Sequence, residues 1–200
     1  AQAHPSRVAW LALRGVFLAT KRELDWFYGG GAGQFWPDLW ARLLEPIPED
    51  EHGNLIAAYN KRLFSGDRGQ QVALAKAWAG WENALASIDN DGVQIDSPAE
   101  YALAFARLEN HYFLNGAFLD DSQKILPNMR RIAHVPGTIV QGRHDMICPP
   151  RSAWMLHKVW PVSELKIIPR AGHAVSEPGI AAELVRTMDR LKRQRETLGL

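Results

Sequence analysis

A block of about one hundred residues with helical periodicity, from Gly15 to about Asn115, separates two segments that have the character of strands. Within the block, Trp, Leu, Ala and Phe recur at intervals of three and four residues, as on the apolar side of a helix. Segments rich in glycine, proline or serine interrupt this pattern at residues 29–31, 46–48, 65–67 and 89–98. The block therefore predicts an all-helical region made of several short helices.

The flanking segments have α/β character. Residues 7–13 (RVAWLAL) form an apolar run without polar alternation, which favours a strand covered on both faces, as in a parallel sheet. Further strands are predicted at 135–141 and 164–168, and helices at 152–160 and from 178 to about 195. The order predicts an α/β fold in which a helical insert interrupts a parallel sheet. An insert of this kind is expected to form a lid over an active site.

The chain starts at Ala1, directly before the first predicted strand, in what reads as the middle of an α/β unit. We therefore expect further residues of the same protein to precede it.

Composition excludes several functional classes. The 23 Lys and Arg residues nearly balance the 22 Asp and Glu residues, so a dedicated nucleic-acid-binding protein is not expected. A single cysteine excludes a disulfide framework, and no apolar run approaches the roughly 18–20 residues that span a bilayer. The eight Trp, seven Phe and four Tyr argue against disorder. We expect a globular, cytoplasmic protein without nucleic-acid or membrane partners, and the sequence leaves its oligomeric state open.

Two residues that follow predicted strands are candidates for catalysis. Asp145 comes shortly after the strand 135–141, and His173 comes shortly after the strand 164–168. Because the carboxyl ends of parallel strands meet at one edge of a sheet, the two side chains are expected to lie close together. An Asp that orients a His is part of a nucleophilic relay, and the order Asp before His is that of α/β-hydrolases. Each residue alone is more often a turn or loop residue.

The nucleophile of such a relay is not evident in this chain. None of its serines lies in the Gly-x-Ser-x-Gly motif, and no His-Gly-Gly run supplies an oxyanion hole. Cys148 is more plausibly a packed thiol than a nucleophile, and His144 a loop residue. No His/Cys cluster has the spacing of a metal site, so neither a metal nor an organic cofactor is expected.

Several motifs resemble the proline iminopeptidase family, which has an α/β-hydrolase fold and serine peptidase activity. They are spread over nearly the whole chain, and two of them, AKAWAGWE and FARLENHYF, lie in the helical block, where α/β-hydrolases differ most. The matching segments are 4–17, 23–40, 56–63, 75–82, 101–113, 140–149 and 171–179.

The resemblance implies that the chain is the C-terminal part of an enzyme that releases N-terminal proline from peptides. It implies Asp145 and His173 as triad acid and base, and Glu82 and Glu109 as carboxylates that receive the α-amino group of the substrate. It also implies an aromatic wall around proline, formed by Phe17, Phe27 and Phe113. At position 27 the family pattern has Tyr, so a hydroxyl contact is expected to be missing here.

The residue types alone support these roles less strongly than the resemblance does. Two carboxylates suit the binding of a protonated amine, and aromatic rings suit the binding of a pyrrolidine. A glutamate in the position of Glu82, however, more often lies on the surface, and such aromatic residues more often belong to the core. The predicted organisation is a hydrolase core at 1–15 and 131–200 with a helical cap at 16–130. Without its nucleophile, the chain alone is expected to be inactive. Another capped α/β-hydrolase, such as an epoxide hydrolase or an esterase, and a non-catalytic remnant remain as alternatives.

Overall fold

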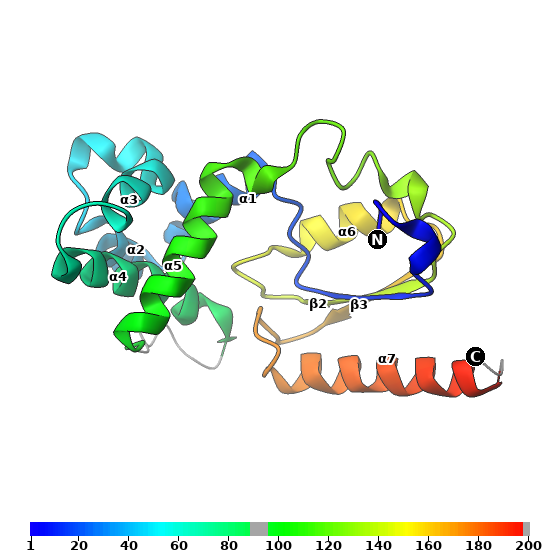
Figure 1. The fold of residues 1–200 in the computed structure, drawn as a ribbon. Coiled ribbons are helices and arrows are strands. Elements are labelled where there is room, and N and C mark those ends of the chain that lie inside the picture. Colours follow the sequence, from blue (N-terminus) through cyan, green and yellow to red (C-terminus); the bar gives the residue numbers. More distant parts are fainter. Residues whose placement is uncertain (89–95, 198–200) are drawn as a thin grey trace. The chain divides into compact units, whose positions relative to one another are not determined.

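A computed structural model describes residues 1–88 and 96–197 of the chain, so part of the predicted interruption at 89–98 lies outside the described residues. The chain divides into two compact units (Figure 1). Residues 1–18 and 121–200 form the sheet unit, and residues 19–120 form the helical unit. In the described residues, no helix is both long enough and apolar enough to cross a membrane.

The sheet unit contains three parallel strands in the order β1-β2-β3. They are β1 (Leu11–Arg14), β2 (Gly137–Gly142) and β3 (Ser163–Ile168). Leu11 pairs with Gly137, which in turn pairs with Ser163, so all three strands end at the same edge. The predicted parallel sheet is therefore present, with small shifts at the strand boundaries.

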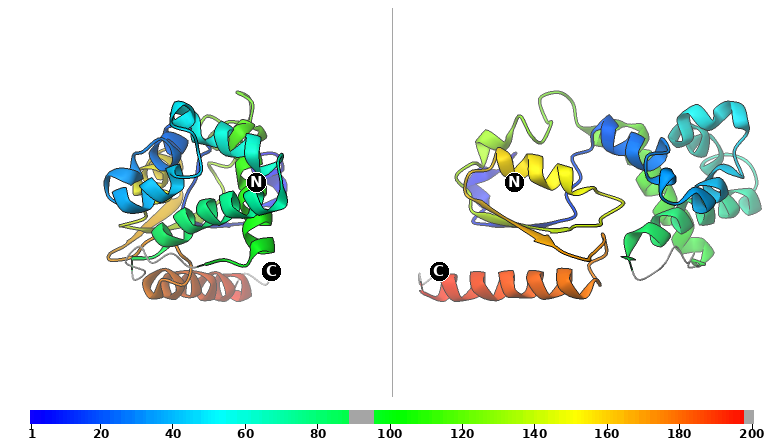
Figure 2. Two further views of the ribbon diagram at one scale, coloured as in Figure 1. Left: turned by 90° about the vertical axis from the view of Figure 1, so that its left-hand side faces the viewer. Right: turned by 180° about the vertical axis from the view of Figure 1, so that it is seen from behind.

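Two helices cover opposite faces of this sheet, α6 (Pro150–Lys158) and α7 (Pro178–Thr197) (Figures 1 and 2). Successive side chains of a strand point to opposite faces, so Ile139 and Val140 of the buried β2 enter different apolar clusters. Ile139 packs with residues of α6, whereas Val140 packs with Ile180 of α7. Both faces of the central strand are thus closed by helices.

The first strand differs from its prediction. Residues Pro5–Arg7 form a 3-10 helix, η1, because proline fixes the backbone in a conformation that suits a first helical position. β1 is consequently short, and Ala12 on it is exposed. Leu11 and Leu13 of β1 pack against the core cluster on one face, and β2 is buried along its whole length.

The helical unit contains no strand among its described residues, as its periodicity predicts. Its α-helices are α1 (Lys21–Tyr28), α2 (Pro37–Leu44), α3 (Leu55–Leu63), α4 (Arg68–Ala86) and α5 (Ala99–Leu114). Short 3-10 helices lie at Ala32–Gln34 (η2), Glu49–Asn54 (η3) and Gly116–Phe118 (η5), and a further one in the sheet unit is Met129–Arg131 (η6).

Side chains near the helix starts fix several of these boundaries. The Thr20 side chain accepts a hydrogen bond from the Glu23 backbone amide, and the Glu23 carboxylate accepts one from the Thr20 amide, which forms a capping box at α1. Asp67 caps α4 in the same way by accepting from the Gln70 amide. These local signals determine where the helices begin.

The core of the helical unit is built around α4, which contacts α2, α3 and α5. Trp78 and Trp81 of α4 are completely buried, and Tyr59 of α3 lies edge-on to Trp78 with ring centroids 5.2 Å apart. Burial of large aromatic side chains of this kind typically stabilises a fold by about 3–5 kcal/mol each relative to alanine. The core thereby holds α4 and α5 in fixed positions and with them the carboxylates described below.

Candidate active site

The Asp145 carboxylate is held in a turn that follows β2. Its Oδ1 accepts hydrogen bonds from the backbone amides of Ile147, at 3.1 Å, and Cys148, at 2.7 Å. Its Oδ2 accepts one from Nε2 of Gln141 at 2.9 Å. The side chain is only 1% exposed. Donors of this kind compensate the loss of hydration and allow a carboxylate to stay ionised when buried.

His173 meets this carboxylate from the loop that follows β3. Its Nδ1 lies 2.9 Å from Oδ2 and 3.1 Å from Oδ1 of Asp145, and its side chain is 20% exposed. Nδ1 therefore carries the proton that faces the carboxylate, which leaves Nε2 as the basic nitrogen. Among the described residues, Nε2 has no hydrogen-bond partner. The pair has the geometry of an oriented general base.

Arg14, the last residue of β1, and Gly15, which follows it, complete the surroundings of His173. The guanidinium group of Arg14 donates a hydrogen bond to the His173 backbone carbonyl. Gly15 has a φ of +52°, and a Cβ atom there would lie 2.7 Å from Cε1 of the imidazole. Glycine is thus required at this position both by the backbone conformation and by the closeness of the ring.

Cys148 and His144 take no part in this pair through their side chains, in the hydrogen bonds described. Cys148 is buried, and its backbone amide and carbonyl contact the Asp145 and Gln141 side chains. His144 is exposed, and its backbone amide donates to the Ala171 carbonyl. Their predicted assignments as a packed thiol and a loop residue agree with these positions.

The helical unit contains a second polar cluster, formed by Tyr28, Trp78, Glu82 and Glu109. The Tyr28 hydroxyl lies 2.5 Å from Oε1 of Glu82 and 3.4 Å from Oε2 of Glu109. Trp78 donates its Nε1 proton to the same oxygen of Glu109 at 2.8 Å and stacks on Tyr28, with ring centroids 4.2 Å apart. The Tyr28 hydroxyl thus contacts both of the predicted carboxylates.

Both carboxylates point inward to different degrees. Glu82 is 7% exposed, and Glu109 is partly buried on α5. Burial raises the pKa of the Tyr28 hydroxyl well above its ordinary value, and the negative charges of Glu109 and Glu82 raise it further. Tyr28 therefore remains protonated and acts as a hydrogen-bond donor between two anionic groups.

The three predicted aromatic residues do not all belong to this cluster. Phe113 is half-buried with its ring 5.7 Å from that of Tyr28, and Phe27 is buried between Tyr28 and Trp81, at 5.0 and 5.4 Å. Phe17 is half-buried in the sheet unit. Phe27 and Phe113 thus both pack against Tyr28, which contacts the two carboxylates, while Phe17 follows β1.

The sequence interpretation missed several residues that contact the predicted ones. Among them are Tyr28, Trp78 and Gln141. The spacing of Trp78 and Glu82, four positions apart on α4, places them on one helix face and was an available signal. Tyr28 and Gln141 had no comparable signal, because one ends a helix and the other lies near the end of a strand.

Within residues 1–88 and 96–197, no group of three or more His, Cys, Asp or Glu side chains is arranged to hold a metal ion. The chemistry that this geometry supports is proton transfer by an imidazole and recognition of a cation by carboxylates.

Comparison with known proteins identifies the relatives of this chain. It is 48% identical over 194 residues to a proline iminopeptidase of Arabidopsis thaliana, covering 96% of this chain and 51% of that protein. It is 46% identical over 180 residues to the proline iminopeptidase of Xylella fastidiosa (strain 9a5c), covering 89% of this chain and 58% of that protein. For the proline iminopeptidase of Neisseria gonorrhoeae the identity is 43%, with 94% and 60% covered. No family model matches the chain.

A solved structure supports the fold. An acetylester hydrolase from Corynebacterium glutamicum superposes with a TM-score of 0.54 and 14% sequence identity, covering 94% of this chain and 56% of that one. The predicted α/β-hydrolase fold and the predicted resemblance are both confirmed. The chain spans little more than half the length of the curated relatives reported above.

Proposed function

We propose that this chain, a homologue of the proline iminopeptidases, is part of a serine peptidase that releases N-terminal proline from peptides. The observation that carries the proposal is the Asp145–His173 pair at the carboxyl edge of a parallel sheet, with Nδ1 2.9 Å from the carboxylate. The curated relatives named proline iminopeptidase supply the substrate class.

The proposed reaction is acyl transfer. A serine hydroxyl attacks the carbonyl carbon of the N-terminal proline while Nε2 of His173 takes the hydroxyl proton. The tetrahedral intermediate breaks its C–N bond, and His173 returns the proton to the leaving amine. Water then attacks the acyl-enzyme, again losing a proton to His173, and proline leaves with the serine restored. Asp145 holds the imidazole tautomer and stabilises the imidazolium.

We assign the serine and the oxyanion donors to residues outside this chain. No serine here lies in a Gly-x-Ser-x-Gly motif, and the relatives are longer than the chain. The full-length enzyme, defined as a protein of the relatives' length that contains this chain, is proposed to hold them. The chain alone is expected to be inactive, because loss of a triad nucleophile costs about a millionfold in turnover.

Recognition of the free amino group is assigned to Glu82 and Glu109. Two carboxylates attract a protonated amine, and the Tyr28 hydroxyl between them holds both in place. An acetylated N-terminus has no positive charge and places a bulky neutral group there. A site that binds a polar group of its substrate discriminates against an analogue that lacks this group by up to about 10⁴–10⁵-fold in kcat/KM.

The organisation and location of the protein are proposed on the same basis. The helical unit, residues 19–120, acts as the cap of the hydrolase core, within the range 16–130 that the sequence analysis gives for the cap. A cytoplasmic location agrees with a chain that has a single cysteine.

The test compares two substrates and two variants of the full-length enzyme. We expect hydrolysis of proline arylamide, at least about a thousandfold slower hydrolysis of its N-acetyl derivative, and a large loss of kcat/KM in Glu82→Gln and Glu109→Gln. Glu100→Gln, on the exposed start of α5, is the control and retains activity. Equal hydrolysis of both substrates, or no effect of the two variants, would instead indicate a hydrolase that does not recognise a free amino group.

A further inference from the structure

Gln141, the penultimate residue of β2, is a polar side chain with no solvent exposure. Its Nε2 donates to Oδ2 of Asp145 at 2.9 Å and to the Cys148 carbonyl at 3.0 Å. Its Oε1 accepts from the Val16 backbone amide at 3.2 Å. Hydrogen bonds at both ends of the amide fix its orientation, since a flipped amide would place its NH2 group against the Val16 amide.

These bonds join the surroundings of the acid to those of the base. Val16 directly follows Gly15, against which the His173 imidazole packs. Asp145 Oδ2 is shared by two donors, Gln141 Nε2 and His173 Nδ1, each at 2.9 Å. A rotation of the carboxylate that shortens the hydrogen bond to one donor lengthens the hydrogen bond to the other. The Gln141 amide therefore fixes the orientation of the carboxylate relative to the imidazole ring.

The chemical character of this partner matters as well as its position. A neutral amide stabilises the anionic form of a carboxylate without cancelling its charge. At 1% exposure, Asp145 thus has a neutral donor beside the imidazole and not a second charge. A cationic partner in place of the amide would compete with His173 for the charge.

We propose that Gln141 is a positioning residue of the Asp145–His173 pair, which orients the carboxylate and keeps it a pure acceptor for His173. The assignment of a catalytic consequence rests on the proposed function, whereas the effect on the NMR signals of His173 does not. Gln141 itself touches neither substrate nor the reacting atoms in this role.

Other ionisable groups lie in the segments packed around the pair. Arg14 donates to the His173 backbone carbonyl, Cys148 contributes a buried thiol from the turn that holds Asp145, and Glu177 is buried in the segment that follows His173. Arg143 and His144 also lie in the turn but are exposed. All of these remain unchanged in the variants below, so differences in the His173 NMR signals report on position 141.

The first experiment replaces the amide by an apolar side chain of similar length, Gln141→Met. In the full-length enzyme we expect kcat to fall at least about tenfold with KM within about twofold, because the loss affects the base and not substrate binding. The NMR signals of the His173 imidazole are expected to shift, since the Asp145 carboxylate that accepts from Nδ1 loses its second donor on Oδ2. This NMR measurement needs no peptidase activity.

Thr138→Val is the matched control. Thr138 lies on the same strand, is 1% exposed and contacts Arg190 and Glu164 instead of Asp145. We expect this variant to lose stability without a change in kcat or in the NMR signals of His173. If Gln141→Met behaves like Thr138→Val in both measurements, Gln141 is merely structural and the proposal is overturned.

Gln141→Glu keeps the size of the side chain and provides the test if the methionine variant does not fold. A buried carboxyl beside Asp145 has a raised pKa, and while protonated it donates to Asp145 as the amide does. When it ionises, two carboxylates repel and the pair is disturbed. We expect near-normal kcat at about pH 6 and a fall of at least about tenfold relative to wild type by about pH 9. A ratio that does not change with pH overturns the proposal.

Discussion

Replacement of Gly15 by alanine tests whether His173 occupies the place that the structure gives it. The added Cβ would lie 2.7 Å from Cε1 and 3.1 Å from Nδ1 of the imidazole. Ordinary van der Waals contact begins near 3.4 Å, so the ring must withdraw by about 0.7 Å. A shift of this size in the direction away from Asp145 lengthens the 2.9 Å contact to about 3.6 Å, beyond a hydrogen bond.

The expected loss has two parts. Alanine in the left-handed region, here at φ +52°, costs about 1–2 kcal/mol, and overpacking against the ring adds about 1–3 kcal/mol. Misplacement of a catalytic group by about 1 Å lowers kcat on the order of a hundredfold. Gly15→Ala is therefore expected to lower both the free energy of unfolding and the turnover of the full-length enzyme.

Gly116→Ala separates these two parts. Gly116 has a similar φ of +57°, but no atom lies within 4 Å of the position that a Cβ would take there, so only the conformational cost applies. Urea unfolding should show a smaller loss for Gly116→Ala, about 1–2 kcal/mol, and steady-state kinetics should show no loss of kcat. Equal stability losses in the two variants, or full activity of Gly15→Ala, would refute the placement of His173.

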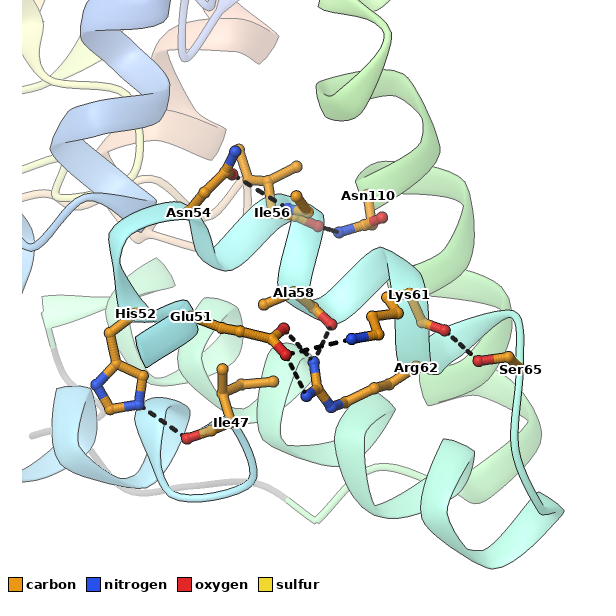
Figure 3. A network of polar contacts seen from close by, with 11 residues as sticks. Ile47, Glu51, His52, Asn54, Ile56, Ala58, Lys61, Arg62, Ser65 and Asn110 are labelled. Atoms are coloured by element: carbon orange, nitrogen blue, oxygen red, sulfur yellow. Dashed lines mark hydrogen bonds and ion pairs between the residues drawn. The ribbon is translucent and has the colours of Figure 1, made fainter. Parts of the chain in front are cut away.

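Two further predictions concern the helical unit. A hydrogen bond from Arg62 lowers the pKa of Glu51 to about 2 (Figure 3), so the stability that ionised Glu51 contributes is present above about pH 4.5 and is lost as pH falls toward 2. The melting temperature of Glu51→Gln should therefore be lower than that of wild type at neutral pH, and the two should become equal near pH 2. A difference in melting temperature that does not change with pH would contradict this. Tyr28→Phe removes the donor shared by Glu82 and Glu109, so KM for proline arylamide should rise about tenfold with a smaller change in kcat; an unchanged KM would argue against the carboxylates as the amine site.

The sequence predicted those features that depend on chain topology. Asp145 and His173 were paired because residues after neighbouring parallel strands meet at one edge, and the structure places them in hydrogen-bond contact. The helical insert was evident from its 3.6-residue period. The strand at 7–13 was placed too early, because the fixed backbone of Pro5 favours a helical turn before β1.

Features that depend on side-chain packing could not be predicted. Glu82 looked like a surface residue because carboxylates are rarely buried, and only the placement of Tyr28 beside it shows how its charge is accommodated. The sequence predicts only that Gln141 ends a strand. Its role could not be predicted because its hydrogen-bonded partners come from segments up to 125 residues away in the sequence. A pattern within one helix or strand does not report such contacts.

The most direct measurement of the central claim is kcat/KM of the full-length enzyme for proline arylamide with Asp145→Asn. The asparagine side chain can present an amide donor to Nδ1, which favours the wrong imidazole tautomer for a general base. We predict a loss on the order of 10⁴-fold in a variant that still folds. Activity within about tenfold of wild type would contradict the assignment of Asp145 and His173 as the orienting acid and the base.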